Sequence, residues 1–194
     1  MTAVPTVTLA DGTVILSPAE AYLPVLSNVE NPELYAIFPY RLYQVTKDNL
    51  TVAINSFNRR KFPCNVGWCQ DVQQAVLLGL TEEASRMIVQ RFTEPTQGMR
   101  FPAFWGPYFD YVPEEDHGAT GKIALQWMIA QPGDENKILM FPSWPKEWDV
   151  EFKLFLPLQT TVEGTCLKGN LVRFIVIPPH RISDVQFVQD YCKL

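Results

Sequence analysis

The sequence predicts an α+β fold in which a helical section is followed by a section of strands. In several segments between Pro32 and Gln131, apolar residues recur every three or four positions, as on the buried faces of helices. After Pro132 and Gly133 the pattern changes to short extended runs rich in branched and aromatic residues. Because helices come first and strands afterwards, we expect separate layers rather than alternating βαβ units. A chain of 194 residues with 47% hydrophobic residues suits one globular domain or slightly more.

Composition divides the chain into three regions. Residues 1–31 predict an extended connector, in which Asp11 and Gly12 form a turn between the extended runs 6–10 and 13–16. Residues 32–132 form the helical region and residues 133–194 the C-terminal β domain.

The helical region begins at Pro32, a residue suited to a first helical turn, and its first short helix stops at Pro39. A modest amphipathic helix is expected over residues 48–60. Stronger helices follow over residues 68–80 and 81–92, joined tightly enough for an αα-hairpin, and another covers residues 120–131. Strands are expected over residues 137–141, 150–156, 171–177 and 185–188.

Charge and motifs exclude several classes of function. Sixteen Lys and Arg against 21 Asp and Glu give a net charge of -5 without a basic run, so nucleic acid is a poor partner. No apolar run approaches the roughly 20 residues that span a membrane. The N-terminus lacks the features of a secretory signal, which predicts a cytoplasmic chain or a leader lost upstream. We find no cofactor motif, and the four cysteines lack the spacing of a zinc site. Reduced thiols are preferred, with a Cys64–Cys69 disulfide as the alternative.

Candidate site residues cluster in the long segment from residue 94 to residue 118. Residues 100–111 hold six aromatics among prolines, and aromatic faces such as those of Trp105 and Tyr108 stack on the apolar faces of sugar rings. Aromatics that simply plug one end of the helical section explain the pattern equally well. Trp68 and Asp71, three residues apart at a helix start, are either a further ligand contact or a capping turn with a buried tryptophan.

Three adjacent acids, Glu114, Glu115 and Asp116, come directly before His117 and Gly118, and Asp116-His117-Gly118 is expected to form a turn. Acidic runs are usually solvated turns. The functional alternative has Asp116 as a general base on water, His117 binding a hydroxyl, and Gly118 letting the backbone approach the ligand. Inversion at a glycosidic bond needs two carboxyl groups about 6.5–9.5 Å apart, and only one is evident here.

Taken in order, these segments resemble the C-terminal half of six-hairpin (α/α)6-barrel glycoside hydrolases related to the inverting α-L-fucosidases and their bacterial homologues. The resemblance runs from about residue 28 to residue 194. It rests on the segment 31–40, on Gly67-Trp68, on the acidic turn before residues 121–131, and on the Phe-Pro-x-Trp-Pro motif at residues 141–145.

The resemblance implies a partial helical-hairpin toroid followed by a small antiparallel β-sheet domain, with Asp116 as the base of an inverting hydrolase acting on an oligosaccharide or polysaccharide. His117 departs from the pattern of the fucosidases, so fucose specificity is not carried over. The family's general acid has no counterpart before Pro32, and a closed barrel needs more helices than this sequence predicts. We therefore expect association with a second copy or with a separate N-terminal half. The alternative is a carbohydrate-binding or structural remnant without catalysis.

Overall fold

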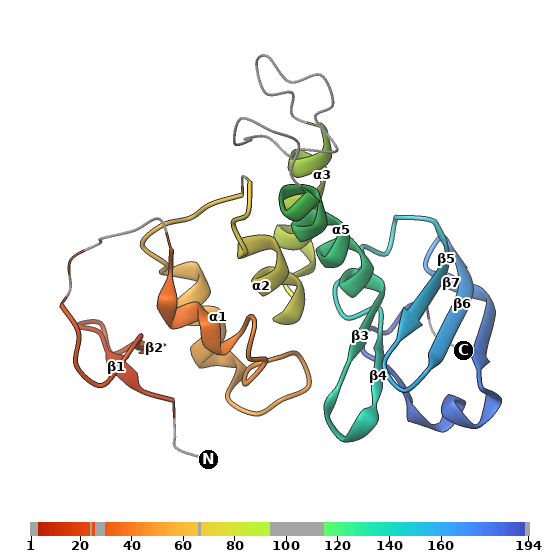
Figure 1. Cartoon of the computed structure of the whole chain (residues 1–194), viewed down its shortest axis with the longest axis horizontal. Coiled ribbons are helices and arrows are strands. Elements are labelled where there is room, and N and C mark those ends of the chain that lie inside the picture. The colour runs from red at the N-terminus through yellow and green to blue at the C-terminus, as the bar shows by residue number, and fades with distance from the viewer. Residues whose placement is uncertain (1–3, 24, 26–29, 66, 94–114, 193–194) are drawn as a thin grey trace.

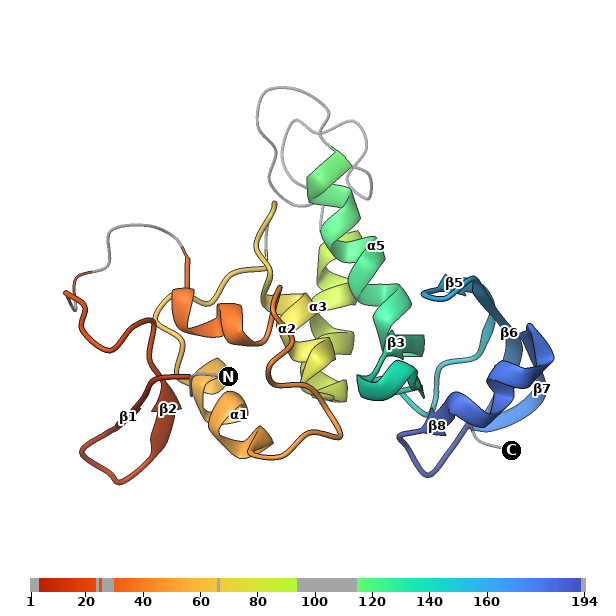
Figure 2. The same cartoon turned by 60° about the horizontal axis from the view of Figure 1, so that its bottom comes forward.

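The structure is a computed structural model that describes residues 4–23, 25, 30–65, 67–93 and 115–192. The N-terminal hairpin lies at one end, the helices in the middle, and the C-terminal strands at the other end (Figure 1). Figure 2 shows the same succession after a 60° rotation, with α5 between the other helices and the strands. In chain order, the longer elements are β1 Thr6–Thr8, β2 Val14–Leu16, α1 Leu50–Asn58, α2 Asp71–Leu77, α3 Thr81–Thr93, α5 Glu115–Ile129, β3 Ala130–Pro132, β4 Ile138–Met140, β5 Val150–Leu156, β6 Thr160–Leu167, β7 Asn170–Ile177 and β8 Val185–Phe187.

The N-terminal hairpin pairs β1 with β2 in antiparallel register. Its turn lies where the sequence predicts, because Gly12 takes a positive φ of 83° and Asp11 accepts a hydrogen bond from the Thr13 amide (3.0 Å). The hairpin is attached to α1. The Leu16 amide donates to Ser56 Oγ (2.7 Å), and Leu16 itself is buried.

The αα-hairpin of α2 and α3 is confirmed. Gly79, with a φ of 73°, turns the chain between them, and a side chain there would meet Val45 and the Pro142 carbonyl. α5 packs against both helices. The short helix expected at Pro32 is a 3-10 helix, Pro32–Ala36. Among these helices, none is long and apolar enough to cross a bilayer.

Two sheets follow α5. In the first, with order β3-β4-β8, β4 pairs antiparallel with β3 but parallel with β8. In the second, β5, β6 and β7 form an antiparallel meander with an irregularity at Thr165 and Cys166. The predicted strands at residues 137–141, 150–156, 171–177 and 185–188 correspond to β4, β5, β7 and β8. The sequence interpretation missed β6, and it extended a helix across β3.

A single apolar cluster joins the helices to the strands. It includes Phe57 of α1, Val76 of α2, Met128 of α5, Met140 of β4 and Val162 of β6, all essentially inaccessible to solvent. The described residues thus share one core.

The predicted partial helical toroid followed by an antiparallel β domain is wrong. In the described part of the chain the helices form a small group beside two sheets, and no ring of helical hairpins is present. α5 runs directly into β3 instead of turning back as a hairpin, and β8 adds a parallel strand. The chain is a small mixed helix and sheet structure. Apolar spacing indicates which face of a helix is buried but not which element covers it, and the toroid came from the resemblance alone.

Candidate functional site

The structure describes only part of the segment in which the sequence predicts the aromatic and acidic site residues. Trp105 and Tyr108 lie outside the described residues. Asp116 and His117 lie in the first turn of α5, and their side chains are also outside the description. The expected turn at residues 116–118 is wrong, because these residues are already helical. Asp116 therefore lies in the helix rather than before it.

Trp68 and Asp71 border the same cleft, which is open to solvent and has a small cavity volume of about 60 Å³. Sites that enclose a whole small molecule measure roughly 300–1,000 Å³, so this cleft admits one substituent or ring edge of a ligand. One wall comes from the segment around the Pro32–Ala36 helix, and the other from the loop before α2 and from α2 itself. The lining residues are Glu30, Asn31 and Tyr35 on the first wall and Cys64, Trp68, Cys69, Gln70, Asp71 and Gln74 on the second. We call this site the Trp68 cleft.

Trp68 and Asp71 differ in how far their side chains are exposed to solvent. Trp68 is 40% exposed, which leaves part of its indole surface available for contact. Asp71 is 3% exposed and accepts hydrogen bonds from Arg60 Nε (2.5 Å) and from the Cys64 amide (2.9 Å) at the same carboxylate oxygen. Burial raises the pKa of Asp71, while these two donors oppose the shift. Asp71 thus anchors the loop through its hydrogen bonds, whereas the Trp68 side chain on the same loop stays partly exposed to solvent.

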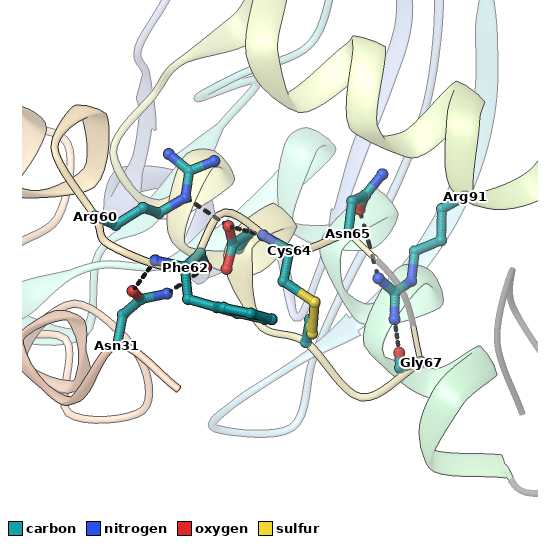
Figure 3. The surroundings of a disulfide bond; sticks show 9 residues. Asn31, Arg60, Phe62, Cys64, Asn65, Gly67 and Arg91 are labelled. Atoms are coloured by element: carbon teal, nitrogen blue, oxygen red, sulfur yellow. Dashed lines mark hydrogen bonds and ion pairs between the residues drawn. A yellow bond between two sulfur atoms is a disulfide. The ribbon is translucent and has the colours of Figure 1, made fainter. Parts of the chain in front are cut away.

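The loop from residue 60 to residue 70 is tied to the rest of the protein at several points (Figure 3). The Asn31 side chain exchanges two hydrogen bonds with the Phe62 backbone, at 2.8 and 3.0 Å. A disulfide joins Cys64 to Cys69. A second disulfide joins Cys166 to Cys192, so each described cysteine is paired and the preference for reduced thiols is wrong. Spacing alone did not reveal the Cys166–Cys192 pair, whose residues are 26 positions apart.

Arg91 of α3 also holds the loop. Its guanidinium donates to the Gly67 carbonyl and to Asn65 Oδ1 (3.5 Å), as Figure 3 shows. Burial lowers the pKa of Arg91 to about 10, although the charge of Asp71 acts in the opposite direction. The guanidinium is therefore still charged at neutral pH. Asn65 in turn donates to the Met87 carbonyl (2.9 Å), which connects the loop to α3 a second time.

Glu30 and Tyr35 form the polar pair of the first wall. The Tyr35 hydroxyl donates to Glu30 Oε2. This hydrogen bond, with burial, raises the pKa of Tyr35 to about 12, so the hydroxyl stays protonated over the physiological range. Glu30 is partly buried. The sequence interpretation singled out neither residue for a site. Glu30 carries no motif, and Tyr35 entered only as part of the segment 31–40 on which the resemblance rests.

Gln70 and Gln74 add acceptors to the second wall. The side-chain oxygens of both residues are buried and have no hydrogen-bond partner among the described residues, and Gln74 is 3% exposed. A buried acceptor without a donor is costly, so such groups usually meet a ligand or an ordered water. No group of three metal-ligating side chains occurs in the described part of the chain.

Neither protein-family models nor curated proteins yield a match for this chain. The resemblance to six-hairpin glycosidases therefore stays a prediction from ordered motifs, and the geometry of the Trp68 cleft carries the functional argument.

Proposed function

We propose that this protein binds a saccharide in the Trp68 cleft. The observation that carries the proposal is the combination of a partly exposed indole with acceptor side chains on both walls. Sugar rings present apolar C–H faces and a rim of hydroxyl donors, so they suit an aromatic surface beside hydrogen-bonding groups. Tyr35, Gln70 and Gln74 supply such groups here.

The rigidity of the loop also supports binding. Trp68 lies between Gly67, held by Arg91, and Cys69, held by the disulfide. A side chain carried by a loop that is already ordered loses less conformational entropy when a ligand binds. The loop therefore has the form of a prearranged binding element.

Alanine substitution of the indole tests the proposal. We expect Trp68→Ala to weaken saccharide binding about 3- to 10-fold, a loss of about 0.7–1.4 kcal/mol, because the substitution removes the aromatic face from the cleft. Isothermal titration calorimetry with neutral oligosaccharides, found by screening a glycan array, measures the change. Phe155→Ala is the matched control, since Phe155 is 74% exposed on β5 and does not line the cleft. Equal affinities for wild type and Trp68→Ala would contradict the assignment.

A second candidate function is inverting hydrolysis with Asp116 as general base. Its support is the resemblance, together with the place of Asp116 in the first turn of α5, a helix that packs against α2 beside the cleft. An inverting reaction also needs a general acid, which this proposal assigns to a partner or to a preceding segment. Release of the aryl group from aryl glycosides, measured with that segment present, should be lost in Asp116→Asn. Unchanged turnover in Asp116→Asn would exclude the role, whereas binding without any turnover would favour a carbohydrate-binding protein.

A further inference from the structure

The Trp68 cleft is rich in acceptors and carries negative charge. Its described lining residues include two carboxylates and two amide oxygens without a donor, and none of them is Lys, Arg or His. The charge of Asp71 is offset by Arg60. Glu30 differs, because the partner observed for it in the described structure is the neutral hydroxyl of Tyr35. The charge of Glu30 therefore remains available to a ligand.

We propose that the saccharide bound here is an amino sugar with a free, protonated amine, such as an oligosaccharide of 2-amino-2-deoxyhexose units. This inference rests on the proposed saccharide binding and names its substrate class. An ammonium group has three donors and no acceptor, which complements a lining of acceptors. It also forms an ion pair with a carboxylate and is attracted to the face of an indole within about 6 Å. Glu30 and Trp68, which both line the cleft, supply these two partners.

Other sugar classes fit this lining less well. A uronic acid would bring a carboxylate beside Glu30, with no cation among the described lining residues to neutralise it. A neutral or N-acetylated sugar brings acceptors as well as donors and leaves the charge of Glu30 uncompensated. The amine is thus the substituent that distinguishes the preferred ligand.

Calorimetry with three ligands of equal length tests the inference: glucosamine oligomers, N-acetylglucosamine oligomers and oligogalacturonate. At pH 6 an amine with a pKa near 7.7–8.0, the range of α-amino groups, is protonated. We expect the glucosamine oligomer to bind about 2- to 5-fold more tightly than its N-acetylated counterpart, in line with one partly exposed ion pair. The preference should vanish at pH 9.5, where the amine is neutral.

Substitutions separate the role of Glu30 from general attraction to an acidic protein. Glu30→Gln keeps an acceptor for Tyr35 and should remove the preference for the amine, while its affinity for the N-acetylated oligomer stays within about 2-fold. Glu151→Gln is the matched control, because it removes the same charge from an exposed position on β5 outside the cleft. Tyr35→Phe removes the neutral donor, leaves the carboxylate in place, and should keep the preference. Melting curves verify that each variant is folded.

The outcomes distinguish the two proposals. Equal loss in Glu30→Gln and Glu151→Gln, or tighter binding of either of the other two ligands, would overturn the amino-sugar assignment and leave saccharide binding intact. Absence of binding by all three ligands and by the neutral oligosaccharides would overturn saccharide binding itself.

Discussion

Removal of the Cys166–Cys192 disulfide should lower the stability of the fold more than removal of the Cys64–Cys69 disulfide. Removal of the Cys64–Cys69 disulfide should weaken ligand binding more. Cys64 and Cys69 are 5 positions apart, whereas Cys166 and Cys192 are 26 apart. In the chain-entropy description a cross-link stabilises the fold by restricting the unfolded chain, which gives about 2 kcal/mol for the shorter loop and about 3.5 kcal/mol for the longer one. Replacement of Cys166 and Cys192 by alanine should therefore lower the free energy of unfolding more. Both side chains are fully buried, so lost packing adds to the difference.

Ligand binding should respond the other way. The Cys64–Cys69 bridge closes the loop that carries Trp68, whereas Cys166 and Cys192 lie outside the lining of the cleft. Urea denaturation followed by tryptophan fluorescence measures the stability of each double alanine variant, and calorimetry with the same oligosaccharide measures its affinity. A larger stability loss in the Cys64 and Cys69 variant would refute the loop-length reasoning. Equal loss of affinity in both variants would refute the role of the loop in presenting Trp68.

Three further predictions concern packing, pH and association. Gly164→Ala should destabilise the protein by about 1–3 kcal/mol in urea denaturation, because its new methyl group would lie 2.6 Å from the Phe152 ring and 2.8 Å from the Arg173 carbonyl. Gly121→Ala, whose methyl group meets side-chain atoms of Phe92 and Arg91 but no backbone atom, should cost less, and the reverse order would contradict the packing argument. The folded pKa of Asp71 lies above its ordinary value near 3.8, so the folded state holds its proton to higher pH. The stability that this proton contributes is complete below pH 3.8 and is lost as the pH rises through the folded pKa. Wild type should therefore lose stability relative to Asp71→Asn over that interval, and a relative gain would refute the direction of the shift. Because β5 and β7 expose apolar side chains, we expect association in light scattering, and a monodisperse monomer would contradict it.

The strands and helices that the sequence predicted well have strong local signals. β5 has the predicted ends because apolar residues alternate along it, and Phe152 and Leu156 are indeed its buried positions. α3 begins at Thr81 as predicted, with Glu82 and Glu83 in its first turn. These signals depend only on neighbours within a few residues, which is why the sequence reveals them.

The missed elements depend on contacts with distant parts of the chain. β6 contains threonines, a glutamate and Gly164, and its strand character comes from pairing on both sides with β5 and β7. At β3 the helical spacing continues through Gln131, whose buried amide instead bonds to Gln44 and to the Val76 carbonyl. Both contacts join residues more than fifty positions apart, so no local pattern indicates them.

The Trp68 cleft, too, could be predicted only in part, because it depends on contacts between distant parts of the chain. The three-residue spacing of Trp68 and Asp71 drew attention to one wall. Their division into an exposed ring and a buried anchor depends on Arg60 and on the disulfide, and the opposite wall comes from Glu30 and Tyr35. Segments that are remote in sequence form the cleft together.

The parallel pairing of β8 with β4 has a consequence for synthesis and for truncation. β4 is made early in the C-terminal half, yet its second neighbour is β8, almost fifty residues later. Until β8 emerges from the ribosome, one edge of the buried strand Ile138–Met140 has no partner strand in its sheet. A nascent chain or a variant that stops before Val185 would present that apolar edge to other chains, which is the arrangement that promotes aggregation. β8 therefore completes the β3-β4-β8 sheet, and shortening the protein from this end should reduce its soluble yield before it alters the Trp68 cleft.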